Sequence, residues 1–468
     1  MKPTIATVDD ASAAPSVRWA LVSLSLSILL SSLGTSIANI GLPTLAQVFD
    51  ASFQQVQWVV LAYLLAITTL IVSAGRLGDL IGRRRLLLAG IGLFALASFL
   101  CSLAPTLGWL VGARALQGLG AAAMMALTMA FVGAAVPKEK TGSAMGLLGT
   151  MSAIGTATGP SLGGLLITGF GWQALFLASV PLGLLALYLA HRFLPADRPQ
   201  PANGRSGFDA LGTLLLALTL AAYSLAMTLG RGHFTALNLG LLLAAGIGLG
   251  LFVFTERRVA SPLIRLTLFR NRVLSSSLAM STLVATVIMT MLVVGPFYLT
   301  HGLGLNPMAA GLVLAVGPGV AALTGVPAGR VADRFGAQRM TVVGLLGMAL
   351  GCLALALLPH TVGVAGYVVS VVVLTLGYGV FQTANNTTVM SDVASEQRGV
   401  ISGMLNLSRN LGLITGASLM GAVFAFASPS VEPEGVAQGM RVTFGVALGL
   451  ILLAIAVSCR SEHARDGR

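Results

Sequence analysis

Residues 75–85 read GRLGDLIGRRR, and a similar stretch, GRVADRFGAQR, occupies residues 329–339 of the 468-residue chain. Each stretch follows an apolar segment and combines glycines with an aspartate and arginines. The glycines permit a tight loop, and the aspartate can pair with an arginine or cap a helix. Two such loops, 254 positions apart, predict an internal duplication of the chain.

A second repeat supports the duplication. Residues 142–164 align with residues 399–421 at an offset of 257. The identical pairs are Gly142/Gly399, Gly146/Gly403, Gly155/Gly412, Thr158/Thr415, Gly159/Gly416, Ser161/Ser418 and Gly164/Gly421. Both copies are expected to cross a membrane in the same direction. The sequence therefore predicts two parallel six-helix units related by an axis along the membrane normal, as is typical of transporters.

The composition is that of a membrane protein. Hydrophobic residues make up 56% of the chain and charged residues 9%, against about 25% charged in soluble domains. A soluble enzyme is thereby excluded. About 20 apolar residues cross a bilayer as a helix, which gives an all-α polytopic membrane protein with fourteen expected transmembrane helices. They begin near Arg18, Val56, Leu86, Leu107, Thr141, Trp172, Phe208, Phe234, Val273, Met308, Met340, Val362, Gly399 and Arg441.

These segments predict a division of the chain into bundles and connections. A cytoplasmic tail (1–16) precedes the N-terminal six-helix bundle (17–195), and two inserted helices (207–257) precede the C-terminal bundle (273–459). Cytoplasmic linkers (196–206 and 258–272) flank the inserted pair, and a second cytoplasmic tail (460–468) ends the chain.

The basic residues predict the orientation. Of the 27 arginines and lysines, 23 fall on one side of the expected helices, and only Arg231 and Arg441 fall on the other. By the positive-inside rule both termini are cytoplasmic. The net charge of +12 is thus a signal of topology, and nucleic-acid binding explains it poorly. The three cysteines are widely separated and form neither a metal motif nor a disulfide framework.

The motifs resemble those of the major facilitator superfamily, in particular its fourteen-helix drug:proton antiporter branch, also called the DHA2-like multidrug exporters. Residues 75–85 resemble the signature loop between helices 2 and 3, and residues 329–339 its second-half echo. Residues 110–120, LVGARALQGLG, resemble the helix 4 motif, and residues 155–164, GTATGPSLGG, the helix 5 motif associated with antiporters. The resemblance implies two bundles around a midplane site, alternating access and a proton gradient as the energy source, with no cofactor.

These motifs supply the candidates for gating. Gly155 and Gly159 form a GxxxG face, which could serve helix packing alone or packing that also permits the bundles to rock. Asp79 and Asp333 are either solvated loop charges or members of gating salt bridges. The gating candidates are Gly75, Arg76, Asp79, Gly82, Arg83, Gly155, Gly159, Pro160, Gly163, Gly164, Gly329, Asp333, Gly336 and Arg339.

Two arginines inside expected helices are the first candidates for binding a substrate. A charge at bilayer depth costs roughly 2.5–3.5 kcal/mol on insertion scales, so each needs a partner or a water-filled cavity. Arg114 has Gln117 one turn away, and Arg409 has Asn406 and Asn410 beside it. The alternative to substrate binding is that the arginine only makes a hydrogen bond to a neighbouring helix. The group formed by Arg409, Asn406 and Asn410 has no equivalent in the first half, which favours a substrate contact for it.

Further polar residues lie on helices that line the cavity in relatives. They are Asn39, Tyr63, Tyr298, Tyr378, Gln382 and Asn386. Each could equally bond a neighbouring helix.

Helix 1 departs from the pattern of the branch. Most members have an aspartate nine residues before the proline that corresponds to Pro43, and here that position is Gly34. None of the fifteen acidic residues lies deep in an expected helix. Two buried arginines without a buried carboxylate disfavour a cationic substrate. The remaining proton-coupling candidates are Asp79, Asp333 and His301, the last being also explained as an exposed loop histidine.

The sequence thus predicts a monomeric secondary exporter of small amphipathic, drug-like compounds in a bacterial cytoplasmic membrane, with proton antiport and no metal. Its partners are a neutral or anionic small molecule, protons and membrane lipids. The alternative within transport is an uptake carrier or facilitator for a small organic anion, in which Arg409 would bind a carboxylate. A membrane enzyme is disfavoured because the five histidines are scattered along the chain and no HExxH motif is present.

Overall fold

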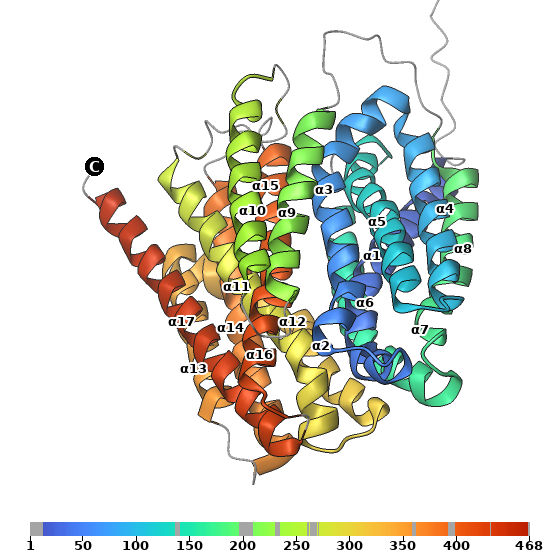
Figure 1. Ribbon diagram of the computed structural model, residues 1–468. Coiled ribbons are helices and arrows are strands. Elements are labelled where there is room, and N and C mark those ends of the chain that lie inside the picture. Colours follow the sequence, from blue (N-terminus) through green and yellow to red (C-terminus); the bar gives the residue numbers. More distant parts are fainter. Residues whose placement is uncertain are drawn as a thin grey trace, which may run out of the picture.

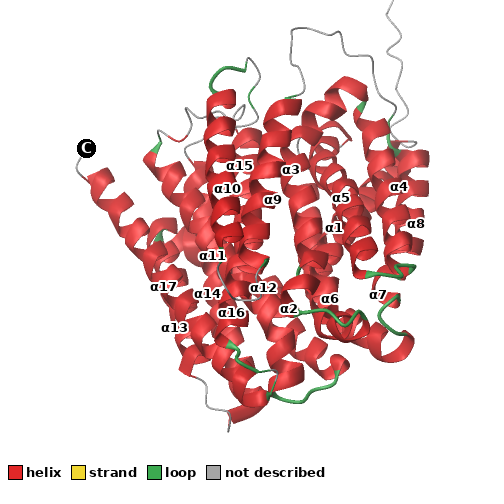
Figure 2. Ribbon diagram, viewed as in Figure 1, coloured by secondary structure: helices red, strands yellow, loops and turns green. Residues whose placement is uncertain are grey.

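Long α-helices form wherever the sequence has an apolar stretch. In lipid every backbone N–H and C=O must be bonded within the protein, and a helix meets that need within one segment. The computed structural model describes residues 13–135, 141–195, 209–229, 235–259, 262, 269, 271–357, 362–391, 398–430 and 432–466. Helices joined by short loops make up nearly all of this described part (Figure 2).

The first half contains α1 to α8. Their bounds are α1 (Ala13–Val48), α2 (Phe53–Val56), α3 (Trp58–Ile81), α4 (Arg83–Ser102), α5 (Leu107–Ala135), α6 (Thr141–Phe170), α7 (Ala174–Leu177) and α8 (Ser179–Phe193). Within this half α1 packs on α6 and α8, and α5 packs on α3 and α4.

An inserted pair and the second half follow. The pair is α9 (Ala210–Thr228) and α10 (Ala236–Glu256). The second half is α11 (Arg272–Phe297), η3 (Tyr298–Gly302), α12 (Pro307–Phe335), α13 (Ala337–Leu357), α14 (Gly363–Ser391), α15 (Arg398–Thr415), η5 (Gly416–Met420), α16 (Gly421–Ala427) and α17 (Pro433–Asp466). Here α11 packs on α15, and α14 packs on α12 and α13. Figure 1 shows the two halves side by side, with α9 and α10 in front of the seam.

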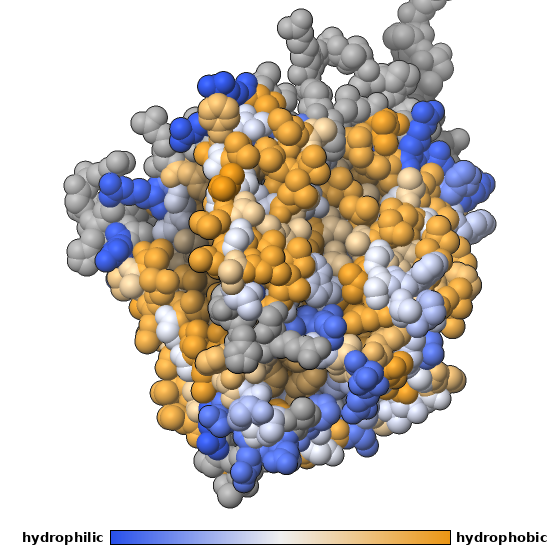
Figure 3. Space-filling view, viewed as in Figure 1, coloured by the Kyte–Doolittle hydropathy of each residue, from blue (hydrophilic) through white to orange (hydrophobic). Residues whose placement is uncertain are grey.

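The all-α polytopic fold is confirmed. Twelve described helices are long and apolar enough to cross a membrane. They cover twelve of the fourteen expected segments, and α6 and α12 lie over the other two. The count of fourteen crossings stays a prediction. Apolar residues cover the middle of the face in Figure 3, and hydrophilic residues gather mainly at its two ends.

The same packing occurs in both halves. Gly155 and Gly159 of α6 lie against the backbone of α1, and Gly412 and Gly416 lie in the same way against α11. Close contact between Gly90 of α4 and Gly120 of α5 is repeated by Gly344 of α13 and Gly377 of α14. These pairs keep the sequence offsets of 257 and 254, so the repeat in the sequence is a repeat of helix contacts.

The buried apolar core is divided unevenly along the membrane normal. One cluster joins the two halves and includes Val56, Val293 and Phe424. Nearer the arginine-rich end, a cluster around Leu24 and Phe94 belongs to the first half alone. Two smaller clusters there belong to the second half alone.

Candidate functional site

The guanidinium of Arg114 is completely buried between α1, α3 and α5. Its Nε donates a hydrogen bond to the Val59 carbonyl at 2.8 Å, and Nη2 donates to the Gly34 carbonyl at 3.0 Å. Nη1 donates to Oε1 of Gln117. Each nitrogen of this intramembrane cation therefore has an oxygen partner, and all three partners are uncharged.

The network extends to α4 and to an aromatic ring. Nε2 of Gln117 donates to Oγ of Ser98 at 2.7 Å. The guanidinium carbon of Arg114 lies 4.2 Å from the centre of the Tyr63 ring, and the Tyr63 hydroxyl donates to the Ser31 carbonyl at 2.8 Å. Arg114 thus connects α1, α3, α4 and α5, which places this sequence-predicted group inside the first half in the conformation described.

Gly34 is part of this enclosure. A Cβ atom at this position would lie 2.8 Å from the Tyr63 hydroxyl and 3.4 Å from the Phe94 ring. The position that carries an acid in most members of the branch is therefore filled by the tyrosine, and the backbone carbonyl of Gly34 receives the arginine instead.

The second intramembrane cation has a more open setting. Arg409 on α15 is partly exposed, and it makes no hydrogen bond or ion pair with any residue that the structure describes. Asn406, one turn earlier, is exposed, whereas Asn410 is buried and its Nδ2 has no described partner. Within the described part of the chain, the Arg409 guanidinium and Asn410 Nδ2 therefore differ from Arg114, whose nitrogens all have partners.

The softer candidates are distributed over several places. On α14, Tyr378, Gln382 and Asn386 are partly exposed, and Nε2 of Gln382 lies 3.4 Å from Oδ1 of Asn386. Asn39 is buried in α1 with Nδ2 bonded to the Thr35 carbonyl at 3.1 Å.

Two further candidates lie towards the other end of the molecule. Tyr298 is buried, with its ring 5.8 Å from that of Tyr367. His301 is partly exposed, and its ring stacks on Phe297 with the centres 6.0 Å apart.

The two signature loops turn in the same way. Gly82 connects α3 to α4 with a φ of 102°, and Gly336 connects α12 to α13 with a φ of 90°. An L side chain rarely adopts such a φ, so glycine is required at both turns. Arg83 and Arg339 lie in the helices that follow, and Gly75 has open space around it. The side chains of Arg76, Asp79 and Asp333, and the surroundings of Gly329, lie outside the described part.

Helix α6 uses two faces to pack. Gly155, Gly159 and Gly163 lie against α1. On another face, Pro160 contacts Gly311 of α12, and Gly164 contacts Pro307 at the start of the same helix. This second contact joins the two halves at the ends of the helices that lie away from the arginine-rich loops.

Aromatic side chains join the halves at the same end. The ring of Phe53, in α2, lies 4.6 Å from that of Phe297 and 5.1 Å from that of Phe424. Nearby, the buried amide of Gln57 presses against Gly421, and neither of its polar atoms has a partner among the described residues. We call Phe53, Phe297 and Phe424 the outer aromatic contact.

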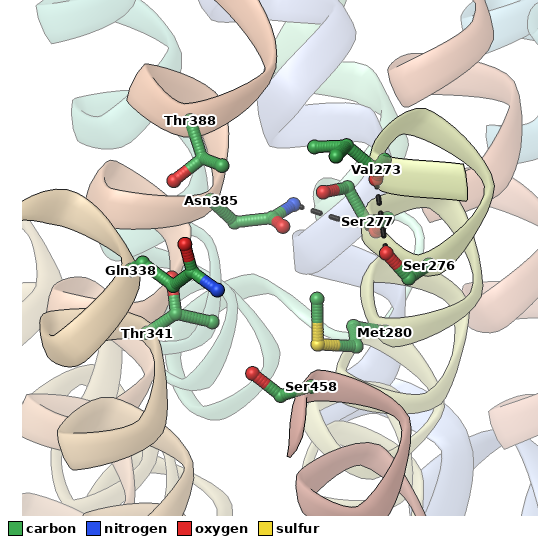
Figure 4. A pocket seen from close by; sticks show the side chains of 9 residues that line it. All are labelled: Val273, Ser276, Ser277, Met280, Gln338, Thr341, Asn385, Thr388 and Ser458. Atoms are coloured by element: carbon green, nitrogen blue, oxygen red, sulfur yellow. Dashed lines mark hydrogen bonds between the residues drawn. The ribbon is translucent and has the colours of Figure 1, made fainter. Parts of the chain in front are cut away.

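A polar pocket lies at the opposite end, inside the second half (Figure 4). It is lined by Val273, Ser276, Ser277, Met280, Gln338, Thr341, Asn385, Thr388 and Ser458. Nδ2 of Asn385 points to the Ser277 carbonyl at 3.4 Å, and its buried Oδ1 has no hydrogen-bond partner in the described chain. The free space, about 20 Å³, suits one water molecule.

Two equivalent positions of the first half are apolar. By the repeat offsets of 254 and 257, Thr341 and Thr388 correspond to Leu87 and Phe131, which are buried together in one cluster. An alignment of the two halves against each other would have exposed this difference in the sequence. Because the pocket lies within one bundle and not between the two, it is separate from a pathway between the halves.

The chain was compared with known proteins. A family model described as Major Facilitator Superfamily matches residues 24–417. The riboflavin transporter RibZ of Clostridioides difficile is 32% identical over 409 residues, which cover 87% of this chain and 88% of RibZ. The multidrug resistance protein Stp of Mycobacterium tuberculosis is 33% identical over 418 residues, 88% of this chain and 77% of Stp.

The fold also matches solved structures. A bacterial homologue of the human lysosomal transporter Spinster, in an inward-facing and unoccupied conformation, superimposes with a TM-score of 0.69. The match covers 95% of this chain and 96% of that chain at 16% sequence identity.

Proposed function

Because the chain belongs to the Major Facilitator Superfamily, whose members are membrane transporters, we propose that it exports small amphipathic, drug-like compounds in exchange for protons. The observation that carries the proposal is its similarity over most of its length to a protein named for multidrug resistance. The resemblance of residues 155–164 to the antiporter motif supports the same direction of transport. Its location would be the cytoplasmic membrane of a bacterium, with both termini in the cytoplasm.

Alternating access would use the two halves as rigid bundles. The outer aromatic contact and the Gly164–Pro307 contact join the bundles at one end, whereas the apolar clusters at the arginine-rich end each belong to one bundle. We infer that this conformation is open to the cytoplasm. In the opposite conformation the outer contacts would part and the arginine-rich ends would close.

The two intramembrane cations support a proposal about the charge of the substrate. Arg114 has three uncharged partners, and Arg409 has no described partner at all. An uncompensated positive charge repels a cationic drug and attracts a carboxylate or a polarised oxygen. We therefore favour neutral or anionic amphipaths, with Arg409, Asn406 and Asn410 as the binding candidates.

Accumulation of three fluorescent compounds, one cationic, one neutral and one anionic, in an efflux-deficient host tests the proposal. Export predicts lower accumulation of the neutral or anionic compound in cells with the protein, and a protonophore should restore it. Unchanged accumulation of all three would contradict drug export.

The variant Arg409→Ala tests the binding assignment. We expect loss of export of the anionic compound while the protein stays in the membrane in normal amount, because Arg409 has no described structural partner. Arg441→Ala, at an exposed arginine near the other end, is the matched control. Full export by Arg409→Ala would remove this residue from the site.

An uptake carrier or facilitator for a small organic anion is the second candidate. It is favoured by Arg409, which has no partner among the described residues, and by the similarity to a protein named as a riboflavin transporter. Raised accumulation of the anionic compound in the same assay would select it over export.

A further inference from the structure

Two carboxyl groups converge at the base of the inserted helix pair. Asp209 caps the start of α9 and is 6% exposed, and Glu256 ends α10 and is 4% exposed. Asp209 Oδ2 and Glu256 Oε1 lie 2.5 and 2.8 Å from the point where a Cβ atom of Gly212 would stand. Because Gly212 has only a hydrogen atom there, both oxygens face the same small space.

The two oxygens of Asp209 are in different situations. Oδ1 accepts a hydrogen bond from the Gly212 N–H at 2.7 Å, which caps the helix. Oδ2 is buried and has no hydrogen-bond partner in the described chain. A buried acceptor without a donor is costly, so a donor is expected in this space. A carboxyl group becomes a donor when it holds a proton.

We propose that Asp209 and Glu256 form a proton-binding site in which one proton is held between Oδ2 and Oε1. A proton shared in this way would give Asp209 Oδ2 the donor that it lacks, and it would remove the repulsion between two facing carboxylates. Uptake forms one O–H bond with a proton from water, and release returns that proton to water. No electrons are transferred.

The surroundings of the pair include basic residues. Arg257 and Arg258 follow Glu256 and are exposed, and the Arg258 guanidinium lies 4.1 Å from the centre of the Phe254 ring. Glu256 also interacts with a further group. Charged side chains on the neighbouring α3 and in the flanking loops that lie outside the described part are Arg76, Asp79, Arg198, Arg205, Asp197, Arg265 and Arg270.

The pair stands where α9 is attached to the first half. Thr213, one turn after Asp209, shares a hydrogen bond of 2.8 Å with Ser73 of α3. At the other end of α9, Thr228 accepts a hydrogen bond of 2.9 Å from the Trp58 indole of α3.

The same helix also reaches the second half. In addition to its two attachments to α3, α9 packs on η5 and α16 of the second half. Helix α9 therefore touches both halves, and a change of charge at its base acts on an element that lies along their seam. The assignment of this proton to transport rests on the proposed antiport, in which the acid missing at Gly34 has to be replaced. The proton-binding site itself does not depend on the proposed antiport.

Infrared spectroscopy of the purified full chain in lipid nanodiscs tests the site directly. An un-ionised carboxyl group has a C=O stretching band that shifts in deuterium oxide and that a carboxylate lacks. We expect one such group per chain at neutral pH, which disappears when the pH is raised. A wild-type protein without this band would overturn the proposal.

Two conservative variants assign the band. Asp209→Asn keeps a good helix cap and places an amide N–H against Glu256, so the protein should fold. Glu256→Gln places an amide N–H against Asp209 in the same way, so this variant should also fold. Both should lose the band, and Glu434→Gln, at an exposed acid in the first turn of α17, should keep it. A band that persists in both variants would place the proton elsewhere.

Transport by the same variants tests the coupling. We expect Asp209→Asn to move its substrate down a concentration gradient at near wild-type rate but to lose accumulation driven by a proton gradient. Normal proton-driven transport by the variant would overturn the coupling role. If wild-type protein moved none of the fluorescent compounds, the proposed export would fail, and the infrared result would still decide the proton site.

Discussion

At the scale of single residues, Arg114 illustrates how a membrane protein stabilises a charge without an opposite charge. Its nitrogens are bonded to two backbone carbonyls and one amide, and its positive charge faces the Tyr63 ring. Hydrogen bonds to a charged donor are stronger than those between neutral groups. In this conformation the residue acts as a connection between four helices.

We expect Arg114→Ala to destabilise the protein by about 3 kcal/mol or more, because three buried oxygens lose their donor at once. The measurement is the midpoint of thermal unfolding in detergent, followed by fluorescence-detected size-exclusion chromatography. Arg114→Lys should recover part of the loss, since an ammonium group cannot match the planar geometry of the guanidinium. Stability equal to wild type in the alanine variant would mean that the network has no structural role.

The sequence predicted that Arg114 needs a partner or a water-filled cavity inside the membrane, but not which groups bond to it. Its role in binding a substrate stays a prediction. Arg114 and Gln117 are one helical turn apart, so their pairing could be read directly from their spacing. The carbonyls of Val59 and Gly34 come from other helices, and no residue pattern specifies which backbone oxygen lies opposite a side chain. For the same reason the convergence of Asp209 and Glu256, 47 positions apart in the chain, was visible only in the structure.

At the scale of helices, small residues determine which faces meet. The contacts of Gly155 and Gly159 with α1 recur as those of Gly412 and Gly416 with α11. Helix pairs in lipid associate largely through such close packing. The spacing of glycines therefore predicted the packing faces, whereas the π-helical segments η3 and η5 carry no signal in hydropathy, because one extra residue in a turn leaves the composition unchanged.

Gly416→Ala should be more damaging than Gly159→Ala. The added methyl group at Gly416 meets the backbone carbonyl of Thr286, which cannot turn away, whereas at Gly159 the first obstacle is the Ser36 hydroxyl. Overpacking of this kind costs roughly 1–3 kcal/mol. Thermal unfolding of both variants in detergent measures the difference.

Two further variants complete that test. Ser36→Gly should partly rescue Gly159→Ala by removing the obstructing side chain, and nothing comparable is available for Gly416. Gly449→Ala, in α17 with open space around the glycine, should be neutral or stabilising. Equal losses in Gly159→Ala and Gly416→Ala would show that the backbone yields as easily as the serine.

At the scale of the whole molecule, the contacts between the two halves that involve described residues include the outer aromatic contact and the Gly164–Pro307 contact, both away from the arginine-rich loops. The internal repeat predicted two similar halves, and the helical fold agrees with that prediction. The sequence could not predict whether the structure would be inward-open or outward-open. A transporter adopts both conformations with one set of residues, so their free energies are close.

Phe53→Ala should shift the protein towards the outward-open arrangement. Each aromatic pair contributes roughly 0.5–1.5 kcal/mol beyond its buried area, and Phe53 makes two such pairs. Spin labels at Asp50 and Glu434, both exposed near that end, would report a larger population of long distances in the variant. Phe53→Leu, which keeps most of the apolar volume, should shift it less. Identical distance distributions in all three proteins would exclude a gating role for the outer aromatic contact.

The position of α10 has a consequence for how the surrounding lipid affects the protein. Only 17% of its apolar segment is buried inside the protein, and its main contact is α9. With 21 residues it is about 31 Å long, close to the hydrocarbon thickness of a bilayer. A membrane with longer acyl chains tilts or shifts such a helix. Because α10 is joined through α9 to both halves, we expect the acyl-chain length of the surrounding lipid to affect how the two halves are held together.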